Sequence, residues 1–404
     1  MKKNAFTLVE LVVTLFILSA ILAATFATFI TLSRSFKAET KTSETQIESV
    51  LGLEILRYDI EMAGYGLPHS TLGVSTCSTG SLPVAYSEAL SSASYTDSSS
   101  YTPNKYTPDP TSFNDSTNSC EPRAVVLSNN GNTGGDATAG TFDDSDVLVI
   151  KSLVVSLSDV TRKYSIRYYD VATSSWKNRA WSSTTRDFVA NDKVIVLSSG
   201  TDVTSSDRAM QQIGATFYAN IDSWPVTTTL PNSGTLTDIF LIYGLETATT
   251  PRMPFNRVDY YLQRANTGFP GKCHPQSYTL YRGVIANDST ASGGKRTEQP
   301  IMDCVVDFQV GLNLDTGWVT TSGAVGSVTD LTTASNVRSK VKQVKVAVLT
   351  HEGQYDKDFS YANTTINLGD STFSMKTYGL TNLTNYQNYK WKVLLIDVKT
   401  VNLL

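Results

Sequence analysis

Hydrophobic residues fill the first part of the chain almost without interruption. The segment Leu11–Ser33 contains no charged residue, and about 20 such residues are enough for a helix to cross the hydrocarbon core of a bilayer. Between Ile47 and Met62 apolar side chains recur every three or four residues, which is the period of a helix with one face packed against a partner. No proline interrupts this pattern. We therefore predict one long helix over residues 6–66, of which about 8–32 span a membrane.

The pattern changes at Gly64, Gly66 and Pro68, because glycine and proline commonly end helices. Residues 67–145 are rich in Ser and Thr and predict a loop region. In residues 146–404, runs of β-branched residues and tyrosines alternate with Gly, Asn, Asp and Ser clusters, a pattern typical of strands. The predicted strands are 146–156, 163–171, 193–198, 214–219, 238–243, 257–264, 277–285, 300–312, 337–350, 372–378 and 389–401.

One of these runs indicates how a sheet face is built. Arg257, Asp259 and Tyr261 alternate with apolar side chains, so polar and apolar residues lie on opposite faces of the strand. The apolar face of such a sheet needs a partner, and so does the outer half of the long helix. We therefore predict an α+β fold, in which the N-terminal helix packs on an enlarged antiparallel β-sheet domain.

The composition and net charge of the chain bear on whether it is folded and whether it binds nucleic acid. Charged residues make up 17% of the 404 residues, the formal net charge is −4, and there are 20 tyrosines. Such a composition is typical of a folded protein rather than a disordered one. A general nucleic-acid binder would concentrate Lys and Arg on one face. The chain as a whole does not, so no nucleic acid is expected as a partner.

One carboxylate, Glu10, stands at the start of the apolar run, where a charge is costly unless it finds a partner. Cleavage after Ala5 would create such a partner, because the new α-ammonium of Phe6 would allow Glu10 to pair with the amino terminus of a neighbouring copy. The sequence Lys2-Lys3-Asn4-Ala5, followed by Phe6-Thr7-Leu8-Val9-Glu10-Leu11, resembles the leader and first residues of a type IV prepilin. The resemblance implies that residues 1–5 are a leader, and that a prepilin peptidase cuts before Phe6 and methylates its amine.

The amino-terminal segment departs from the prepilin pattern at one residue and is open to two other interpretations. Family members usually carry Gly where this chain has Ala5, but both residues are small and cleavage is still expected. The segment is also compatible with a secretory signal peptide cut after Thr25-Phe26-Ala27, or with a plain membrane anchor. Lys2 and Lys3 precede the span, so the positive-inside rule leaves the amino terminus in the cytoplasm. We expect a single-pass protein of the bacterial inner membrane that then enters an extracellular pilus.

A second resemblance narrows the family. The run Leu56-Arg57-Tyr58-Asp59-Ile60-Glu61-Met62-Ala63-Gly64-Tyr65-Gly66 is similar to the helix end of PilW-type minor pilins. The segments Val258–Leu262, Leu280–Arg282, Val305–Val310 and Val344–Val348 are similar to strands of the same group. The resemblance implies a structural subunit that joins other minor pilins and the major pilin, helps prime assembly, and sits at or near the tip with a large tip adhesin as a further partner. Alternatives are a J-type minor pseudopilin of type II secretion, or a pilus-displayed adhesin or DNA-binding subunit.

Four cysteines fit an oxidising compartment outside the cytoplasm, where even numbers of cysteines usually pair. Three pairings are possible. We favour Cys77 with Cys120 and Cys273 with Cys304, because each pair is nearest in sequence. Free buried thiols are the alternative.

An enzyme would need a constellation of catalytic side chains, and few candidates are present. His351-Glu352 begins a zinc-binding motif, but Tyr355 stands where the second histidine would be. Cys273-His274 lacks the earlier cysteine of a haem attachment motif. We therefore expect no enzymatic activity, no cofactor and no metal.

Two clusters of charge have a structural and a functional interpretation. Asp143, Asp144 and Asp146 follow a loop rich in Gly and Asn, where oxygen ligands could hold Ca²⁺, although an ordinary hairpin loop is favoured. A basic cluster is predicted on one face of a strand, where positive charge commonly protects a sheet edge; contact with DNA is the alternative. The basic cluster consists of Arg338, Lys340 and Lys342.

Overall fold

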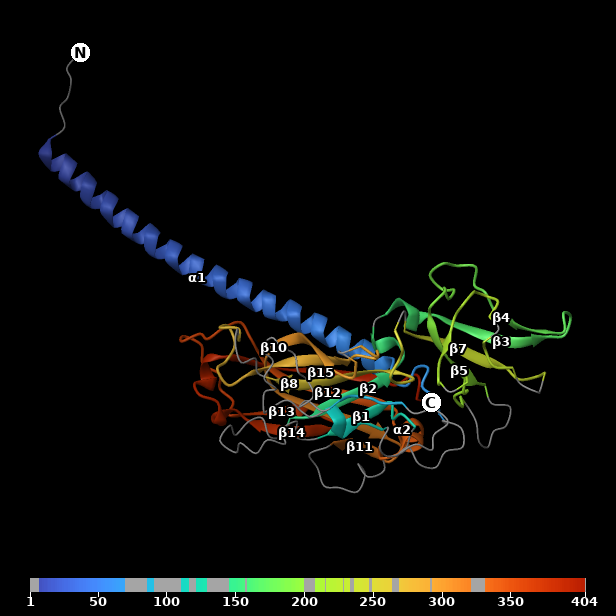
Figure 1. Cartoon of the computed structure of the whole chain (residues 1–404). Coiled ribbons are helices and arrows are strands. Elements are labelled where there is room, and N and C mark those ends of the chain that lie inside the picture. The colour runs from blue at the N-terminus through green and yellow to red at the C-terminus, as the bar shows by residue number, and fades with distance from the viewer. Residues whose placement is uncertain are drawn as a thin grey trace, which may run out of the picture.

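A long helix is followed by a large sheet and a smaller second sheet in the computed structural model of the chain (Figure 1). The described residues are 7–69, 86–90, 110–115, 121–128, 145–156, 158–199, 208–214, 216–227, 229–232, 236–246, 249–263, 269–290, 293–320 and 331–403.

The first element is the helix α1, Leu8–Glu61. Thr7 caps its start, because Thr7 Oγ1 accepts a hydrogen bond from the Glu10 N–H while the Glu10 carboxylate accepts one from the Thr7 N–H. The helix ends earlier than predicted. Gly64 and Gly66 have φ angles of +83° and +68°, which glycine adopts without strain, so the chain turns away from the helix axis there.

The main sheet has eight antiparallel strands in the order β1-β2-β8-β9-β10-β12-β15, with β11 paired to β10. α1 lies against β10, β12 and β15 (Figure 1). Leu56 and Ile60 of α1 share one buried core with Phe308, Val310 and Val346 of the sheet. The strands are β1 (Val125–Ser128), β2 (Val147–Ser152), β8 (Asn256–Gln263), β9 (Tyr278–Ile285), β10 (Arg296–Leu314), β11 (Gly317–Thr320), β12 (Gln343–Glu352) and β15 (Lys390–Lys399).

β10 joins the two halves of this sheet. Its first half pairs with β9, its second half pairs with β12 and β11, and the pairing to β9 shifts register between Met302 and Val305. The chain before β2 returns to the second half of β10. The Asp146 N–H donates to the Phe308 carbonyl at 2.8 Å, and the Val310 N–H donates to Asp146 Oδ2 at 2.7 Å. The sheet therefore curls until the start of β2 meets β10.

The second sheet has five strands in the order β4-β3-β7-β5-β6. It lies beyond the C-terminal end of α1, on the side away from the amino terminus (Figure 1). Ile195, Leu197 and Leu245 of this sheet belong to the same buried core as Leu56 of α1, so the two sheets are packed together. The strands are β3 (Tyr164–Asp170), β4 (Ser175–Asn178), β5 (Lys193–Ser198), β6 (Ala219–Asn220) and β7 (Phe240–Glu246).

Smaller elements complete the head. A two-stranded hairpin packs on the face of the main sheet opposite α1, through a buried cluster that includes Val306 and Trp391. The hairpin is formed by β13 (Thr365–Gly369) and β14 (Ser374–Gly379), and the second helix is α2 (Ala334–Lys340). Short 3₁₀ helices occupy Pro110–Phe113, Val154–Ser156, Asp159–Arg162, Leu380–Asn382 and Tyr386–Asn388.

Three predictions about the elements need correction. The run predicted as one strand over 337–350 begins as α2, because Val337 and Val341, four residues apart, are both buried on one side, and a spacing of four is helical rather than extended. The predicted loop region 67–145 contains β1 and the buried 3₁₀ helix Pro110–Phe113. The predicted strand over 214–219 contributes only its last residue, to β6.

Candidate assembly site on the amino-terminal helix

The start of α1 carries one acidic side chain in an apolar surrounding. Glu10 Oε2 accepts hydrogen bonds from the Thr7 N–H and the Thr7 hydroxyl, both at 2.9 Å. Within the described part of the chain, Glu10 Oε1 has no hydrogen-bond partner. One oxygen of the carboxylate is thus held by its own helix, and the other is open to a group from outside. Ala5 and Phe6, the predicted cleavage and methylation residues, lie outside the described residues.

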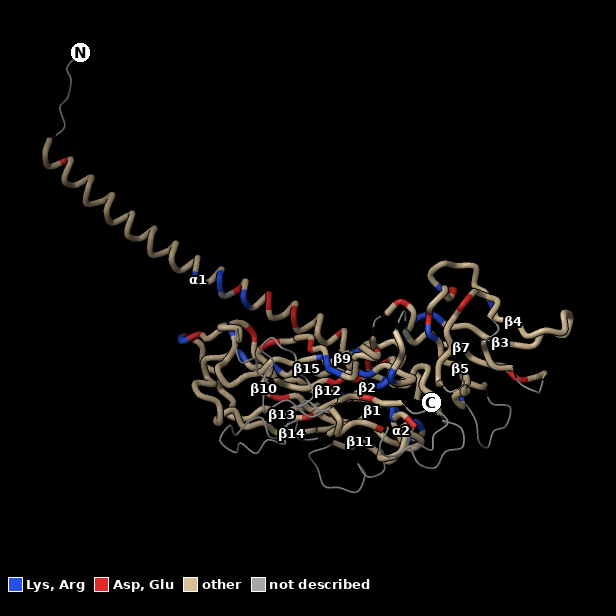
Figure 2. The backbone as a smooth tube through the Cα atoms, viewed as in Figure 1, with Lys and Arg blue, Asp and Glu red and all other residues tan. Residues whose placement is uncertain are grey.

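The apolar side chains of the first half of α1 are exposed in a single copy of the chain. Among the described residues, α1 is the one helix with a stretch long and apolar enough to cross a membrane, and none of that stretch is buried in the structure. Leu8 is 81% exposed and Leu32 is 67% exposed. Figure 2 shows α1 without charge between the acidic residue near its start and the first basic residue. This surface needs lipid or other helices to cover it.

The second half of α1 is held on the sheet by a buried ion pair. The Arg282 Nε–H donates to Asp59 Oδ2 at 2.7 Å, and the Tyr260 hydroxyl donates to the same oxygen at 2.6 Å. Burial raises the pKa of the Asp59 carboxyl, while the guanidinium of Arg282 and the hydroxyl of Tyr260 act against that rise. All three residues are buried. They fix both the position and the rotation of α1 on β8 and β9.

Further contacts hold the middle of α1. Lys272 Nζ donates to Glu48 at 2.7 Å, and the Gly353 N–H donates to Thr45 Oγ1 at 3.2 Å. A side chain at Gly52 would place its Cβ 2.5 Å from the Ile301 carbonyl oxygen, so α1 approaches β10 as closely as its backbone allows. These contacts leave one outward stripe of the helix uncovered. The stripe consists of Ile47, Val50, Leu51 and Ile55.

The opposite face of the sheet carries a buried charge cluster. Lys151 Nζ contacts Glu88 Oε2 at 2.7 Å and Asp115 Oδ2 at 2.6 Å, and Arg257 contacts Asp259 at 2.7 Å and Glu88 at 3.3 Å. The polar side of β8 that the sequence indicates therefore faces other protein segments instead of water. Glu88 and Asp115 come from the predicted loop region, and these ion pairs pin that region to the sheet.

The structure describes one of the two predicted disulfides. Cys273 and Cys304 are joined by a disulfide, with the Cα atoms 4.8 Å apart. It connects the segment before β9 to the register shift of β10. Cys77 and Cys120 lie outside the described residues, and their pairing stays a prediction.

The acidic cluster that the sequence suggested as a Ca²⁺ site is described only in part. Asp146 is buried and accepts from the Val310 N–H as described above; Asp143 and Asp144 lie outside the described residues. In the described ranges no group of three or more His, Cys, Asp or Glu side chains is placed to hold a metal ion.

The basic cluster does not lie on a strand, because Arg338 and Lys340 belong to α2. Arg338 contacts Glu121 at 3.9 Å, so the predicted basic face of a strand is wrong.

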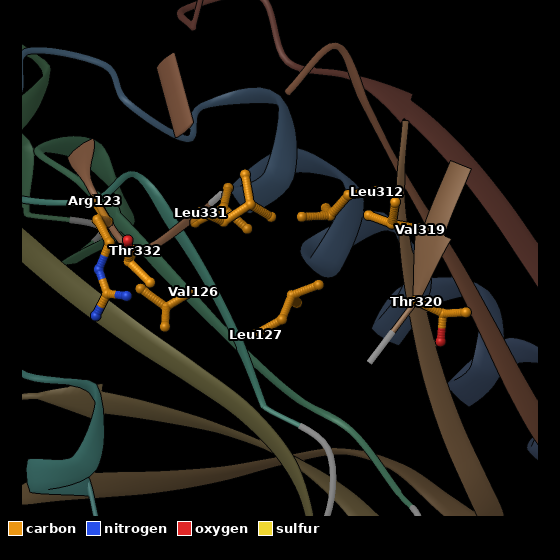
Figure 3. A pocket seen from close by; sticks show the side chains of 9 residues that line it. Arg123, Val126, Leu127, Leu312, Val319, Thr320, Leu331 and Thr332 are labelled. Atoms are coloured by element: carbon orange, nitrogen blue, oxygen red, sulfur yellow. The ribbon is translucent and has the colours of Figure 1, made fainter. Parts of the chain in front are cut away.

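A pocket of about 120 Å³ lies between β1 and β11, next to the loop before α2 (Figure 3). Ligand sites for drug-sized molecules enclose roughly 300–1,000 Å³, so this pocket is small for a ligand-binding site. Most of its walls are apolar, with Arg123 at one end. The lining residues are Arg123, Val125, Val126, Leu127, Leu312, Val319, Thr320, Leu331 and Thr332.

Sequence reasoning identified Glu10 but missed Asp59, Arg282 and Tyr260. The signal was present, because Asp59 is a charge on the otherwise apolar side of an amphipathic helix and Arg282 is a charge in an apolar strand. A charge in such a position is almost always paired.

Residues 1–26 match a family model described as the prokaryotic N-terminal methylation motif. No curated protein and no solved structure matches the chain. The family of this motif is structural rather than catalytic, and the motif implies processing by a prepilin peptidase and assembly with other pilins. The apolar helix and the motif suggest membrane anchoring followed by pilus assembly. With its long helix and antiparallel head, the chain has an α+β pilin-like architecture, and the motif indicates the precursor of a type IV pilin-like or pseudopilin subunit.

Proposed function

We propose that the protein is a minor pilin of the PilW type, a structural subunit of a type IV pilus. Cleavage after Ala5 makes Phe6 the methylated amino terminus. The open oxygen of Glu10 then pairs with the ammonium group of a neighbouring subunit, which converts a costly lone charge into a satisfied one. The bare apolar half of α1 and its outward stripe pack against the helices of other minor pilins and the major pilin.

The position of the second sheet supports a place at or near the tip. The amino terminus of α1 is the end held in the inner membrane, with its first residues in the cytoplasm, so a filament extruded from that membrane carries its earlier subunits beyond the C-terminal end of α1. The second sheet occupies this space (Figure 1). A subunit inside a crowded shaft would meet its neighbour there, whereas a subunit at the tip would not. Such a subunit primes assembly and presents its head to a large tip adhesin.

The role of Glu10 is tested by the substitution Glu10→Val. We expect roughly tenfold less of the protein in sheared pili, because the variant keeps the apolar helix but loses the charge that selects a neighbour's ammonium group. The amount in the inner membrane should be unchanged. The quantity to measure is the ratio of pilus-bound to membrane-bound protein by quantitative mass spectrometry, which also reports whether the amino terminus is N-methyl-Phe6.

The matched control is Glu39→Val, because Glu39 is an exposed glutamate on the same helix and lies well away from the amino terminus. It should enter pili like the wild type. Equal recovery of both variants would contradict the assembly role of Glu10. Loss of protein secretion with normal pili, after deletion of the protein, would assign it to a type II secretion pseudopilus instead.

A further inference from the structure

β15 is a long edge strand. Among the described strands it pairs with β12 alone and ends the strand order of the main sheet. The pairing runs over ten residues without a register shift. The other end strands of the two larger sheets, β1, β4 and β6, have four, four and two residues. Natural proteins keep exposed edges short, bulged or interrupted by proline, because a row of unpaired backbone N–H and C=O groups is a template for another strand.

Described residues cover the two faces of β15, and none of them covers its outer edge beyond the first turn. Leu394 and Ile396 pack against the core under α1, and Trp391 and Val393 pack against the cluster under the β13–β14 hairpin. The turn before β15 is covered, because the Asp356 N–H donates to the Asn388 carbonyl at 3.0 Å. Past that turn, no hydrogen bond from a described residue reaches the outer edge of β15.

The side chains along the edge indicate what kind of segment fits it. The centre of β15, residues 393–396, is apolar and uncharged, and Leu395 is 37% exposed. Three lysines and one aspartate, Asp397, make the strand net positive. Lys399 has no ion pair within the described ranges. The three lysines are Lys390, Lys392 and Lys399.

We propose that the β15 edge receives a strand from another subunit of the same filament, an inference that rests on the proposed function. Only an extended segment can satisfy a row of backbone donors and acceptors, so main-chain hydrogen bonds would hold it. Its side chains would be apolar opposite residues 393–396 and net acidic opposite the lysines. Because α1 lies against β15, the edge is next to the helix along which other subunits pack. A second copy of β15 fits less well, since both strands would be net positive.

Photo-cross-linking in the full-length protein tests this proposal. We would place p-benzoylphenylalanine at Leu395, at Leu236 as a control, and at Ile47 as a reporter of helix packing. Leu236 is 55% exposed and lies before β7 in the second sheet. In sheared filaments we expect cross-links from Leu395 and Ile47 and none from Leu236. Mass spectrometry should place the Leu395 cross-links in one extended, net-acidic segment of another subunit.

Cross-links from Ile47 without any from Leu395 would overturn the strand addition and leave the proposed function standing. Cross-links from Leu395 only to a second copy of this chain would also overturn it. Absence of cross-links from both positions, with no protein in filaments, would overturn the proposed function and the inference with it.

A charge in the middle of the edge gives a second readout. Leu395→Lys should lower recovery in filaments by roughly tenfold, whereas Leu236→Lys should have no effect. Leu395 is 37% exposed and Leu236 is 55% exposed, so a lysine at either position can keep its ammonium group in water. Both variants should therefore stay folded, and thermal unfolding measures this. Recovery of Leu395→Lys at the wild-type level would contradict the proposal.

Discussion

A few buried polar side chains fix the position of α1 on the main sheet. Asp59 is the point where the helix, β8 and β9 meet, because one carboxylate oxygen serves both Arg282 and Tyr260. In a buried ion pair the loss of one partner leaves the other charge without compensation. The position of α1 is therefore sensitive to substitution of Asp59, although nothing in the sequence alone marks Asp59 as buried.

Asp59→Ala should lower the free energy of unfolding of the head by about 3–5 kcal/mol, since Arg282 would stay buried without its carboxylate. Denaturant unfolding of the full-length protein in detergent, followed by tryptophan fluorescence, measures this loss. Arg57→Ala is the control two residues away, because the ion pairs of Arg57 with Glu54 and Glu61 are exposed and worth about 0–1 kcal/mol. Equal losses for both variants would mean that the buried pair does not fix the helix.

A second residue makes stability depend on pH. His351 is buried and its Nε2 accepts a hydrogen bond from the backbone N–H of His274 at 2.9 Å, while its Nδ1 has no hydrogen-bond partner among the described residues. Burial lowers the pKa of His351 to about 3, with the nearby His274 and Lys272 adding to the shift and the backbone of Glu352 opposing it. The ordinary pKa of histidine is about 6.5. The folded state thus holds a neutral imidazole that the unfolded state protonates more readily.

The contribution of this neutral histidine is complete above pH 6.5 and is lost progressively as the pH falls towards 3, because only the unfolded state gains the proton in that interval. We expect a loss of roughly 1 kcal/mol per pH unit below about pH 6. The comparison of wild type with His351→Gln, whose amide oxygen can still accept from the His274 N–H, isolates this effect. Parallel stability curves of the two proteins between pH 7.5 and 4.5 would contradict it.

At the scale of elements, local patterns predicted the helix well and the sheet less completely. The face that packs on the sheet was predicted wrongly, because the apolar repeat that starts at Ile47 is largely exposed, whereas Leu56 and Ile60 on a neighbouring face are buried. Both faces are apolar, so spacing alone does not tell which one the sheet covers. Strands such as β8 and β9 follow from their β-branched and tyrosine residues. The order of the strands does not, because the pairing of β10 with both β9 and β12 depends on contacts between distant residues. Short strands such as β6 have too few residues for any pattern.

The disulfide also acts at the scale of elements, because it joins the segment before β9 to β10 near the point where the pairing of these strands shifts register. The Cys273–Cys304 bond closes a loop with a sequence separation of 31 residues, and loops of this length contribute about 3–4 kcal/mol through restriction of the unfolded chain. The double variant Cys273→Ser with Cys304→Ser should lose about that much in denaturant unfolding. Wild-type protein unfolded under reducing conditions should show a comparable loss. An unchanged midpoint in both cases would show that packing alone holds the segment before β9 on β10.

At the scale of the whole molecule, two features of the head were beyond sequence reasoning. The second sheet was predicted as separate strands, but its place beyond the end of α1 follows from the packing of Ile195, Leu197 and Leu245 on the main core. The buried charges of Glu88 and Asp115 were hidden in a segment predicted as a loop, because a single sequence does not indicate which polar residues are enclosed by others. Glu10, by contrast, was predictable because a lone charge next to an apolar run stands out without any tertiary context.

The place of the subunit along the filament can be tested through the second sheet. Val171 follows β3 and is 76% exposed, so a cysteine there can take a maleimide-gold label without disturbing the core. If the second sheet fills the space that an earlier subunit would need in the shaft, Val171→Cys should label filament ends and leave the shafts bare in electron micrographs. A cysteine at exposed Leu8, which faces other helices in the proposed filament, should stay unlabelled in intact pili. Gold particles spaced along the shafts would show that the second sheet fits between stacked subunits, and the tip position would have to be given up.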